Sequence, residues 1–206
     1  MGYTVRTFVA IELPDAVRRL LEDQQRRLEH ALQDAQLAHV VRWTAAPNLH
    51  LTLRFLGETS ATQRDAVDRG LTALLQAQGA FPLALRQLGC FPNWRRPNIV
   101  WIDFSGATAT LGRLQQQVEQ AAIAAGFAAE ERPFTAHLTI GRVRKDAGLR
   151  ERQQLGEVLQ RTQAQIASLL AVHTAQFTVA QVALMQSDLR PSGPVYATLV
   201  DYSLKG

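Results

Sequence analysis

The chain of 206 residues is poor in cysteine and lysine and has no long apolar run. Its single cysteine, Cys90, excludes an internal disulfide and a structural zinc site built from several thiolates. No apolar stretch reaches the roughly 20 residues that a membrane-spanning helix needs. The first residues carry Arg6 and Glu12 where a secretion signal would need an unbroken apolar segment. These features predict a cytoplasmic protein in a reducing compartment, with no membrane partner.

Lysine is scarce among the basic residues: Lys145 and Lys205 are the only two, and the rest are arginine. Lys and Arg together number 22 against 18 Asp and Glu, a formal net charge of +4. This excess favours anionic partners weakly and does not choose between phosphate and nucleic acid. Hydrophobic residues make up 47% and charged residues 19%, which allows a sizeable core. No low-complexity tract divides the chain, so we expect residues 1–206 to form a single domain.

A four-residue phrase occurs twice: HLTL begins at His50 and HLTI begins at His137. Each phrase places a threonine two positions after the histidine, at Thr52 and Thr139. Side chains at i and i+2 of a strand project from the same face about 6.6 Å apart, so each histidine would have a hydroxyl beside it. The two phrases lie close to half the chain apart, which indicates two pseudo-repeated lobes.

Hydrophobic periodicity and turn residues predict alternating strands and helices along the chain. Strands are expected over 5–13, 40–44, 49–55, 83–91, 99–104, 134–143, 177–185 and 195–204. Helices are expected over 15–36, from a cap at Thr59 or Ser60 through Leu75, over 108–125 and over 149–170. The Pro- and Gly-rich stretch 187–194 is expected to be a turn or loop.

The two motif strands show the alternation of a half-buried strand. Over 49–55 the odd-numbered positions are apolar, whereas His50, Thr52 and Arg54 share the opposite face. Over 135–140 the same alternation sets the histidine and the threonines against an apolar face. We expect the apolar faces to be buried and to fix the strands that aim the histidines.

Two histidines of this kind suit an in-line displacement at phosphorus. The reaction needs a base to deprotonate the nucleophile and an acid to protonate the leaving oxygen on the opposite side. Histidine titrates near pH ~6.5, so one copy can be neutral while the other is protonated. The two threonines would donate hydrogen bonds to the non-bridging oxygens as negative charge develops on them. This scheme needs no metal ion and no cofactor.

Four phrases of the chain resemble the 2H phosphoesterase superfamily, and within it the branch of RNA 2′,3′-cyclic phosphodiesterases, also called 2′-5′ RNA ligases. They are RTFVAIELP near the start, NLHLTLRFLGE, FTAHLTIGRVR, and SDLRPSGPVYATL near the end. The likeness runs from Arg6 to about Leu199. It implies a bilobal α+β fold, with two pseudo-symmetric lobes whose antiparallel sheets line a central groove and whose helices lie outside.

The resemblance also implies a reaction, in which the 2′,3′-cyclic phosphate at an RNA end is opened to a 2′-phosphate and a 3′-hydroxyl. Carried over to this chain, His50 is the general acid that protonates the departing 3′ oxygen, and His137 is the general base that activates water. An RNA 5′-hydroxyl in place of water would give 2′-5′ joining without ATP. The expected partner is an RNA with a cyclic phosphate end, such as a tRNA fragment, or a small nucleotide. The protein is expected to be a monomer.

Family members use an aromatic and an arginine five positions after the two histidines, which match Phe55 and Arg142 here. Strict alternation would put both on the wrong face, so either the strand ends or bulges before them or their role is indirect. Arg142 is expected to contact phosphate, whereas Phe55 is either a core residue or a base-stacking residue. Many relatives carry proline before the second histidine, where this chain has Ala136.

Several alternatives stay open. His50 and His137 could bind zinc, although a third ligand is needed and no Asp or Glu occupies a matching strand position. The protein could be a noncatalytic RNA-end binder, although binding alone would not need two proton-transfer groups. The same site could act on a small nucleotide cyclic phosphate or a 2′-phosphorylated dinucleotide. The loop formed by Trp94, Arg95 and Arg96 could contact RNA or be a solvated turn.

Overall fold

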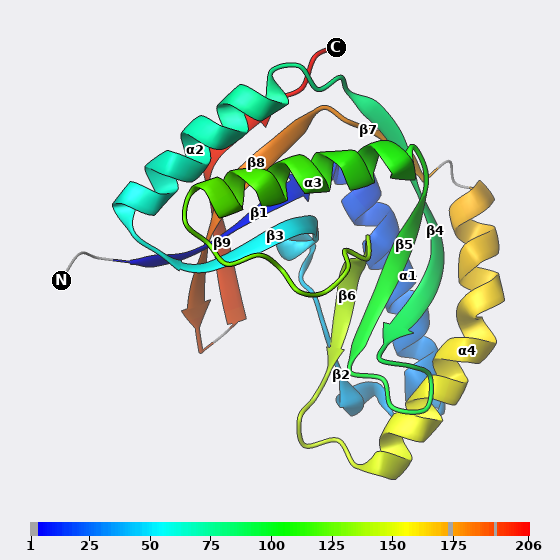
Figure 1. The fold of residues 1–206 in the computed structure, drawn as a ribbon. Coiled ribbons are helices and arrows are strands. Elements are labelled where there is room, and N and C mark those ends of the chain that lie inside the picture. The colour runs from blue at the N-terminus through cyan, green and yellow to red at the C-terminus, as the bar shows by residue number, and fades with distance from the viewer. Residues whose placement is uncertain (1–3, 173–174, 192) are drawn as a thin grey trace.

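The computed structural model describes residues 4–172, 175–191 and 193–206. Its strands are β1 (Val5–Glu12), β2 (Val41–Trp43), β3 (His50–Thr59), β4 (Phe81–Phe91), β5 (Ile99–Gly106), β6 (Leu138–Val143), β7 (Gln176–Val179), β8 (Gln181–Arg190) and β9 (Gly193–Ser203). Within the described residues they form two antiparallel sheets (Figure 1). One sheet has four strands in the order β3-β1-β8-β9, and the other has five in the order β2-β6-β5-β4-β7.

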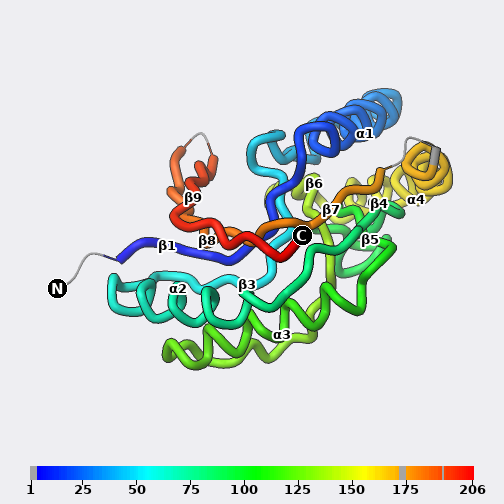
Figure 2. The backbone as a smooth tube through the Cα atoms, turned by 90° about the horizontal axis from the view of Figure 1, so that it is seen from above, coloured from blue at the N-terminus to red at the C-terminus, as the bar shows by residue number. Residues whose placement is uncertain are grey.

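The helices lie outside the sheets. They are α1 (Asp15–Asp34), α2 (Ala61–Leu75), α3 (Thr108–Ala124) and α4 (Leu149–Val172), with short 3-10 turns at Ala38–Val40 and Ala46–Asn48. Helices α2 and α3 pack together against the four-stranded sheet, whereas α1 and α4 lie on the five-stranded sheet (Figure 2). No helix in the described part of the chain combines the length and apolar content that crossing a membrane requires. Two antiparallel sheets with helices outside them make an α+β fold, so the expected class is confirmed.

Each sheet takes strands from both halves of the chain. Strand β3, which carries the first motif, pairs with β1, and β1 pairs with β8 near the end of the chain. Strand β6, which carries most of the second motif, pairs with β2 and β5 from the first half. The two motifs therefore belong to different sheets, and the lobes are interleaved along the sequence. Their pseudo-symmetry stays a prediction.

The ends of the helices follow local sequence signals. Ser60 caps α2, because its side chain accepts a hydrogen bond from the backbone of Gln63 while the Gln63 side chain accepts one from the backbone of Ser60. Helix α3 is followed by Gly126 at φ +88°, in the left-handed conformation that commonly closes a helix. Helix α1 begins at Asp15, with Pro14 as its N-cap.

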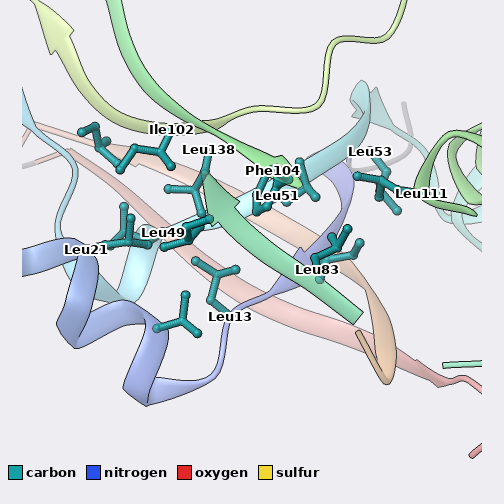
Figure 3. Close-up of a cluster of buried hydrophobic side chains, with 14 of the residues drawn as sticks. Leu13, Leu21, Leu49, Leu51, Leu53, Leu83, Ile102, Phe104, Leu111 and Leu138 are labelled. Atoms are coloured by element: carbon teal, nitrogen blue, oxygen red, sulfur yellow. The ribbon is translucent and has the colours of Figure 1, made fainter. Parts of the chain in front are cut away.

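The apolar residues of both motifs lie in one hydrophobic core, as predicted. Leu51, Leu53, Leu138 and Ile140 are each at most 3% exposed. Figure 3 shows Leu49, Leu51 and Leu138 in the same cluster of buried side chains. Burial of an aliphatic side chain contributes roughly 1.5–3 kcal/mol. These residues therefore anchor the two strands whose opposite faces carry the histidines.

The prediction of a turn or loop over 187–194 is wrong for most of this stretch, and among its described residues only Pro191 lies in a turn. Residues 187–190 complete β8, and residues 193–194 begin β9, so the two strands form a long hairpin. Strand β9 is the edge of its sheet, where a proline such as Pro194 can be accommodated. Ser192 lies outside the described residues.

Two strands differ in extent from the sequence prediction. The single strand expected over 177–185 is two strands, β7 and β8, which break at Ala180 and belong to different sheets. The strand expected over 134–143 begins only at Leu138, so His137 immediately precedes β6. Residues before Leu138 still carry the chain across from α3, and pairing with β5 begins at that leucine. Alternation in a sequence does not reveal where strand pairing starts.

Candidate active site

The first motif strand does not alternate as strictly as its sequence suggests. Thr52 and Arg54 pair with consecutive residues of β1, so Leu53 between them is an extra residue, the mark of a β-bulge. Beyond the bulge the two faces exchange: Phe55 is 61% exposed, and Leu56 is buried instead. The pattern that groups Phe55 with the buried leucines is therefore wrong, and of the stated alternatives the structure contains the bulge.

The second motif strand has its bulge at the equivalent position. Thr139 and Gly141 pair with consecutive residues of β5, which leaves Ile140 as the extra residue, three positions after His137. Arg142, two residues further on, is exposed. In each motif the bulge thus turns the fifth residue after the histidine away from the core and toward the histidine side.

Each histidine ring is fixed by a carbonyl two residues before it. The Nδ1 atom of His50 lies 2.8 Å from the carbonyl oxygen of Asn48, and the Nδ1 atom of His137 lies 2.7 Å from that of Thr135. A carbonyl oxygen can only accept a hydrogen bond, so Nδ1 carries the proton in both neutral rings. Both histidines therefore present Nε2 as the basic atom.

An aromatic ring from another strand packs against each histidine. The ring centroid of Phe8 in β1 lies 4.9 Å from that of His50, and the centroid of Phe91 in β4 lies 4.9 Å from that of His137. A further ring, Tyr196 of β9, meets His50 edge-on at 5.2 Å. The rings of Phe8 and Tyr196 are themselves 5.0 Å apart, so His50 belongs to a cluster of three rings from three strands of its sheet.

Burial lowers the pKa of both histidines. For His50, burial lowers the pKa to about 4; the carbonyl hydrogen bond opposes this shift, and the positive charges of Arg142 and Arg18 add to it. For His137, burial is again the main cause of the lowered pKa, with a further contribution from Arg142. Both rings are therefore neutral at pH 7 in the unliganded protein.

Arg142 links the two motifs electrostatically. Its positive charge lowers the pKa of His50 and of His137, and it also acts on the hydroxyl of Tyr196, whose pKa is raised mainly by burial. Charges interact appreciably only over short distances in a protein. Strands β3 and β6 are also in contact although they belong to different sheets. The motif strands are thus in contact with each other, and a single guanidinium is in electrostatic range of both histidines.

The other predicted site residues lie close to this region. Thr52 and Thr139 are half-buried, each on its motif strand just before the bulge. The ring of Phe55 lies 5.9 Å from that of Phe8, which in turn packs on His50. Two imidazoles, two hydroxyls, a guanidinium and an exposed aromatic ring can together bind a phosphate ester and move protons on either side of it.

The sequence prediction missed the rings that pack on the histidines. Phe8 and Tyr196 lie in phrases that carry the family resemblance, but no sequence feature links either of them to His50. Only the fold reveals these ring contacts, because the register of β1 and β3 pairs His50 with Glu12 and not with Phe8. Phe91 ends the strand expected over 83–91, and nothing in the sequence indicates that it packs edge-on against His137.

The residues of the loop at 94–96 differ in burial. Trp94 is half-buried against the hydrophobic core. Its carbonyl approaches α4 so closely that any side chain at Gly156 would collide with it. Arg95 and Arg96 are exposed, and contact with RNA through them stays a prediction.

A zinc site would need a third protein ligand near the histidines. Among the residues that the structure describes, no group of three or more His, Cys, Asp or Glu side chains could hold a metal ion. Cys90 is a buried free thiol, and burial raises its pKa to about 11. The zinc alternative therefore finds no ligand set in this part of the chain.

The chain matches a known family model and several named proteins. Residues 22–191 match the profile of the 2′-5′ RNA ligase superfamily. The chain belongs to this superfamily. This member is 30% identical over 200 residues to the RNA 2′,3′-cyclic phosphodiesterase of Methanothermobacter thermautotrophicus, covering 97% of the chain and 99% of that protein. It is 31% identical over 154 residues to the enzyme of the same name from Aeropyrum pernix, covering 75% and 81% of the two chains.

Solved structures show that this superfamily member also shares its fold with known proteins. The crystal structure of E. coli LigT complexed with 3′-AMP superposes with a TM-score of 0.72 at 22% identity, covering 99% of this chain and 100% of that one. A protein from Thermus thermophilus superposes with a TM-score of 0.72 at 24% identity, covering 98% of both chains. The architecture of two interleaved antiparallel sheets is thus common to these proteins.

Proposed function

We propose that this protein opens RNA 2′,3′-cyclic phosphate ends to a 2′-phosphate and a 3′-hydroxyl. The observation that carries the proposal is the matched pair His50 and His137, in which each Nδ1 is bound to a carbonyl, each Nε2 is left basic, and Arg142 is in range of both rings. The names of the relatives from Methanothermobacter and Aeropyrum support the same substrate class.

In the proposed reaction, His137 Nε2 takes a proton from water while the water oxygen attacks phosphorus. The bond between phosphorus and the 3′ oxygen breaks, and protonated His50 gives its Nε2 proton to that oxygen. Thr52 and Thr139 donate hydrogen bonds to the non-bridging oxygens, and the guanidinium of Arg142 offsets their charge. Proton exchange with solvent then returns both rings to their starting states. No metal ion or cofactor takes part in these steps.

The acid role requires His50 to gain a proton when substrate binds. Its pKa of about 4 leaves it neutral in the free protein, chiefly because the ring is buried. A phosphodiester anion beside the ring favours the charged imidazolium and raises the pKa. Binding of the substrate thus promotes protonation of His50, which is the general acid. Without a bound anion, the low pKa of His50 keeps the ring neutral.

The same residues suit ligation. With an RNA 5′-hydroxyl in the place of water, His137 takes the hydroxyl proton, the new bond forms to phosphorus, and the 3′ oxygen leaves with the proton of His50. The product is a 2′-5′ phosphodiester, and no ATP is consumed. In this proposal Phe55 stacks on a base of the bound RNA, which its exposed ring beside Phe8 supports.

The test is to incubate the protein with an RNA that carries a 2′,3′-cyclic phosphate, in the presence of EDTA, and to identify the product. His50→Ala and His137→Ala should each lower turnover by about 10²- to 10⁴-fold. His30→Ala is the matched control, because His30 is an exposed histidine of α1. Unchanged turnover in both site variants would remove the catalytic assignment, and inactivation by EDTA would remove the metal-independent mechanism.

Two further outcomes distinguish the alternatives. Tight binding of the cyclic end by the wild type without turnover would indicate a noncatalytic RNA-end binder. Faster turnover of a mononucleotide cyclic phosphate than of RNA would shift the substrate class to small nucleotides. The monomeric state and the cytoplasmic location stay predictions from the sequence, and light scattering after gel filtration tests the first of them.

A further inference from the structure

Arg54 is an arginine of the first motif strand that the proposed reaction does not use. Because the bulge at Leu53 exchanges the faces of β3, its side chain turns from the histidine side to the helix side. There its Nε lies 2.7 Å from Oε2 of Glu119 in α3, and the two side chains are only 10% and 18% exposed. This is a nearly dry ion pair, in which the loss of one partner leaves a buried charge.

The Arg54 guanidinium also holds a segment that comes from elsewhere in the chain. Its Nη2 donates to the carbonyl of Ala128 at 2.5 Å, and its Nη1 lies 3.2 Å from Oε2 of Glu130. The free carboxylate oxygen of Glu119 accepts a hydrogen bond of 2.9 Å from the backbone of Glu130. Arg54 and Glu119 thus both bind residues 128–130.

Residues 125–137 carry the chain from α3, on the four-stranded sheet, to β6 in the other sheet (Figure 1). Most of this segment has no regular secondary structure, and it ends at His137. It also contains Thr135, whose carbonyl fixes the ring of His137. By contrast, the carbonyl of Asn48 that fixes His50 belongs to the 3-10 turn Ala46–Asn48. The orientation of the second histidine therefore depends on an irregular segment.

We propose that Arg54 is a positioning residue for His137. Its bonds hold residues 128–130 against β3. They thereby fix the path of the segment that contains Thr135 and His137, and so position the second motif relative to the first. Arg54 does not touch the substrate in this proposal. The kinetic part of the inference rests on the proposed function, whereas the effect on the His137 ring does not.

Two substitutions separate positioning from stability. Arg54→Met alone leaves the carboxylates of Glu119 and Glu130 close together without their cation, so it should destabilise the fold as well as release the segment. The double variant Arg54→Met with Glu119→Gln removes the uncompensated buried charge and should recover stability. It still lacks the bonds to Ala128 and Glu130. Arg54→Lys keeps the charge but not the forked geometry, and serves as the conservative variant.

The first measurement follows the ring carbon resonances of His50 and His137 by NMR as a function of pH. In the double variant, the His137 signals should move or broaden and titrate at a changed pH, whereas the His50 signals should stay near their wild-type positions. The second measurement is turnover of an RNA cyclic phosphate. Misplacement of a catalytic group by about 1 Å can cost about 100-fold, so kcat should fall by about 10- to 100-fold with little change in KM. Arg54→Lys should lie between wild type and the double variant.

The matched control is Tyr202→Phe, which removes another long-range polar contact: the hydroxyl of Tyr202 in β9 donates to Asp68 of α2 at 2.8 Å. This variant should keep wild-type kcat and wild-type histidine spectra. If the double variant folds, keeps both histidine titrations and turns over within twofold of wild type, the positioning role of Arg54 is wrong. Absence of turnover in the wild type would instead overturn the proposed function, and the ring spectra would still decide the role of Arg54.

Discussion

Arg142 lies close enough to His50 to lower its pKa, although the two residues are on strands of different sheets. It acts in the same direction on His137, which belongs to its own motif. The bulge at Ile140 turns this arginine to the histidine side, and Phe55 takes the matching place in the first motif. The two motifs thus share a bulge at the same position, and the residue five places after the histidine is phenylalanine in one and arginine in the other.

Removal of this guanidinium should raise the pKa of both histidines. In Arg142→Met, burial still lowers both values, but the charge contribution is lost, so each ring should titrate at a higher pH than in the wild type. Binding of inorganic phosphate should weaken at the same time. NMR titration of the ring carbons checks the first effect and calorimetry checks the second. Arg113→Met on the exposed side of α3 is the control and should change neither; lowered or unchanged histidine pKa values in Arg142→Met would contradict the assignment.

Binding of a phosphate ester should be coupled to proton uptake. The pKa of His50 is about 4 in the free protein, and a bound anion raises it, so at pH 6 the complex should take up part of a proton. Affinity for 2′-AMP should therefore increase as the pH is lowered from 8 to 6. Titration calorimetry in buffers of different ionisation enthalpy measures the number of protons directly. His50→Gln should abolish most of the uptake, and equal uptake in both proteins would contradict the role of this ring.

Stability should fall in mild acid because of the same buried ring. Folding lowers the pKa of His50 from its usual 6.5 to about 4, so between these values the unfolded chain binds a proton that the folded protein does not. The free energy of unfolding should therefore decrease as the pH falls through this window, by about 3 kcal/mol in full. Urea unfolding at pH 7, 6, 5 and 4 tests this. His50→Gln should show a shallower dependence, and parallel curves would argue against a buried neutral His50.

Two neighbouring positions of β3 should respond in opposite ways. Leu53 is 3% exposed, so Leu53→Ala should lower the free energy of unfolding by about 2–5 kcal/mol. Phe55 is 61% exposed, so Phe55→Ala should cost only about 0.5 kcal/mol while raising KM for an RNA substrate. Chemical unfolding and steady-state kinetics on the two variants provide the comparison. If Phe55→Ala instead lost much stability and kept its KM, Phe55 would be a core residue and not a base-stacking residue.

Much of the fold could be predicted from local signals. The four long helices, the buried leucines of the motifs and the Ser60 cap of α2 follow from periodicity and capping, which depend on neighbours in the sequence. The bulges at Leu53 and Ile140 could not be located, because an extra residue in a strand depends on its partner strand. The division of 177–185 between two sheets is likewise decided by long-range pairing.

The residues of the candidate site follow from the sequence, whereas their arrangement does not. The repeated phrase identified both histidines and both threonines, and the family resemblance added Phe55 and Arg142. The carbonyls that fix the tautomers could not be foreseen, because they depend on the backbone path before each motif strand. The turn of Arg54 toward α3 also follows from the bulge, and strict alternation predicts the reverse.

The interleaving of the two sheets has a consequence for dissection of the protein. A cut between α3 and β6 would leave each fragment with an incomplete version of both sheets, because β8 and β9 complete the first sheet and β6 and β7 complete the second. Neither fragment on its own would contain both histidines. Co-expressed fragments could restore the site only by reassembling, which makes this chain a candidate for a split reporter rather than a source of autonomous half-proteins.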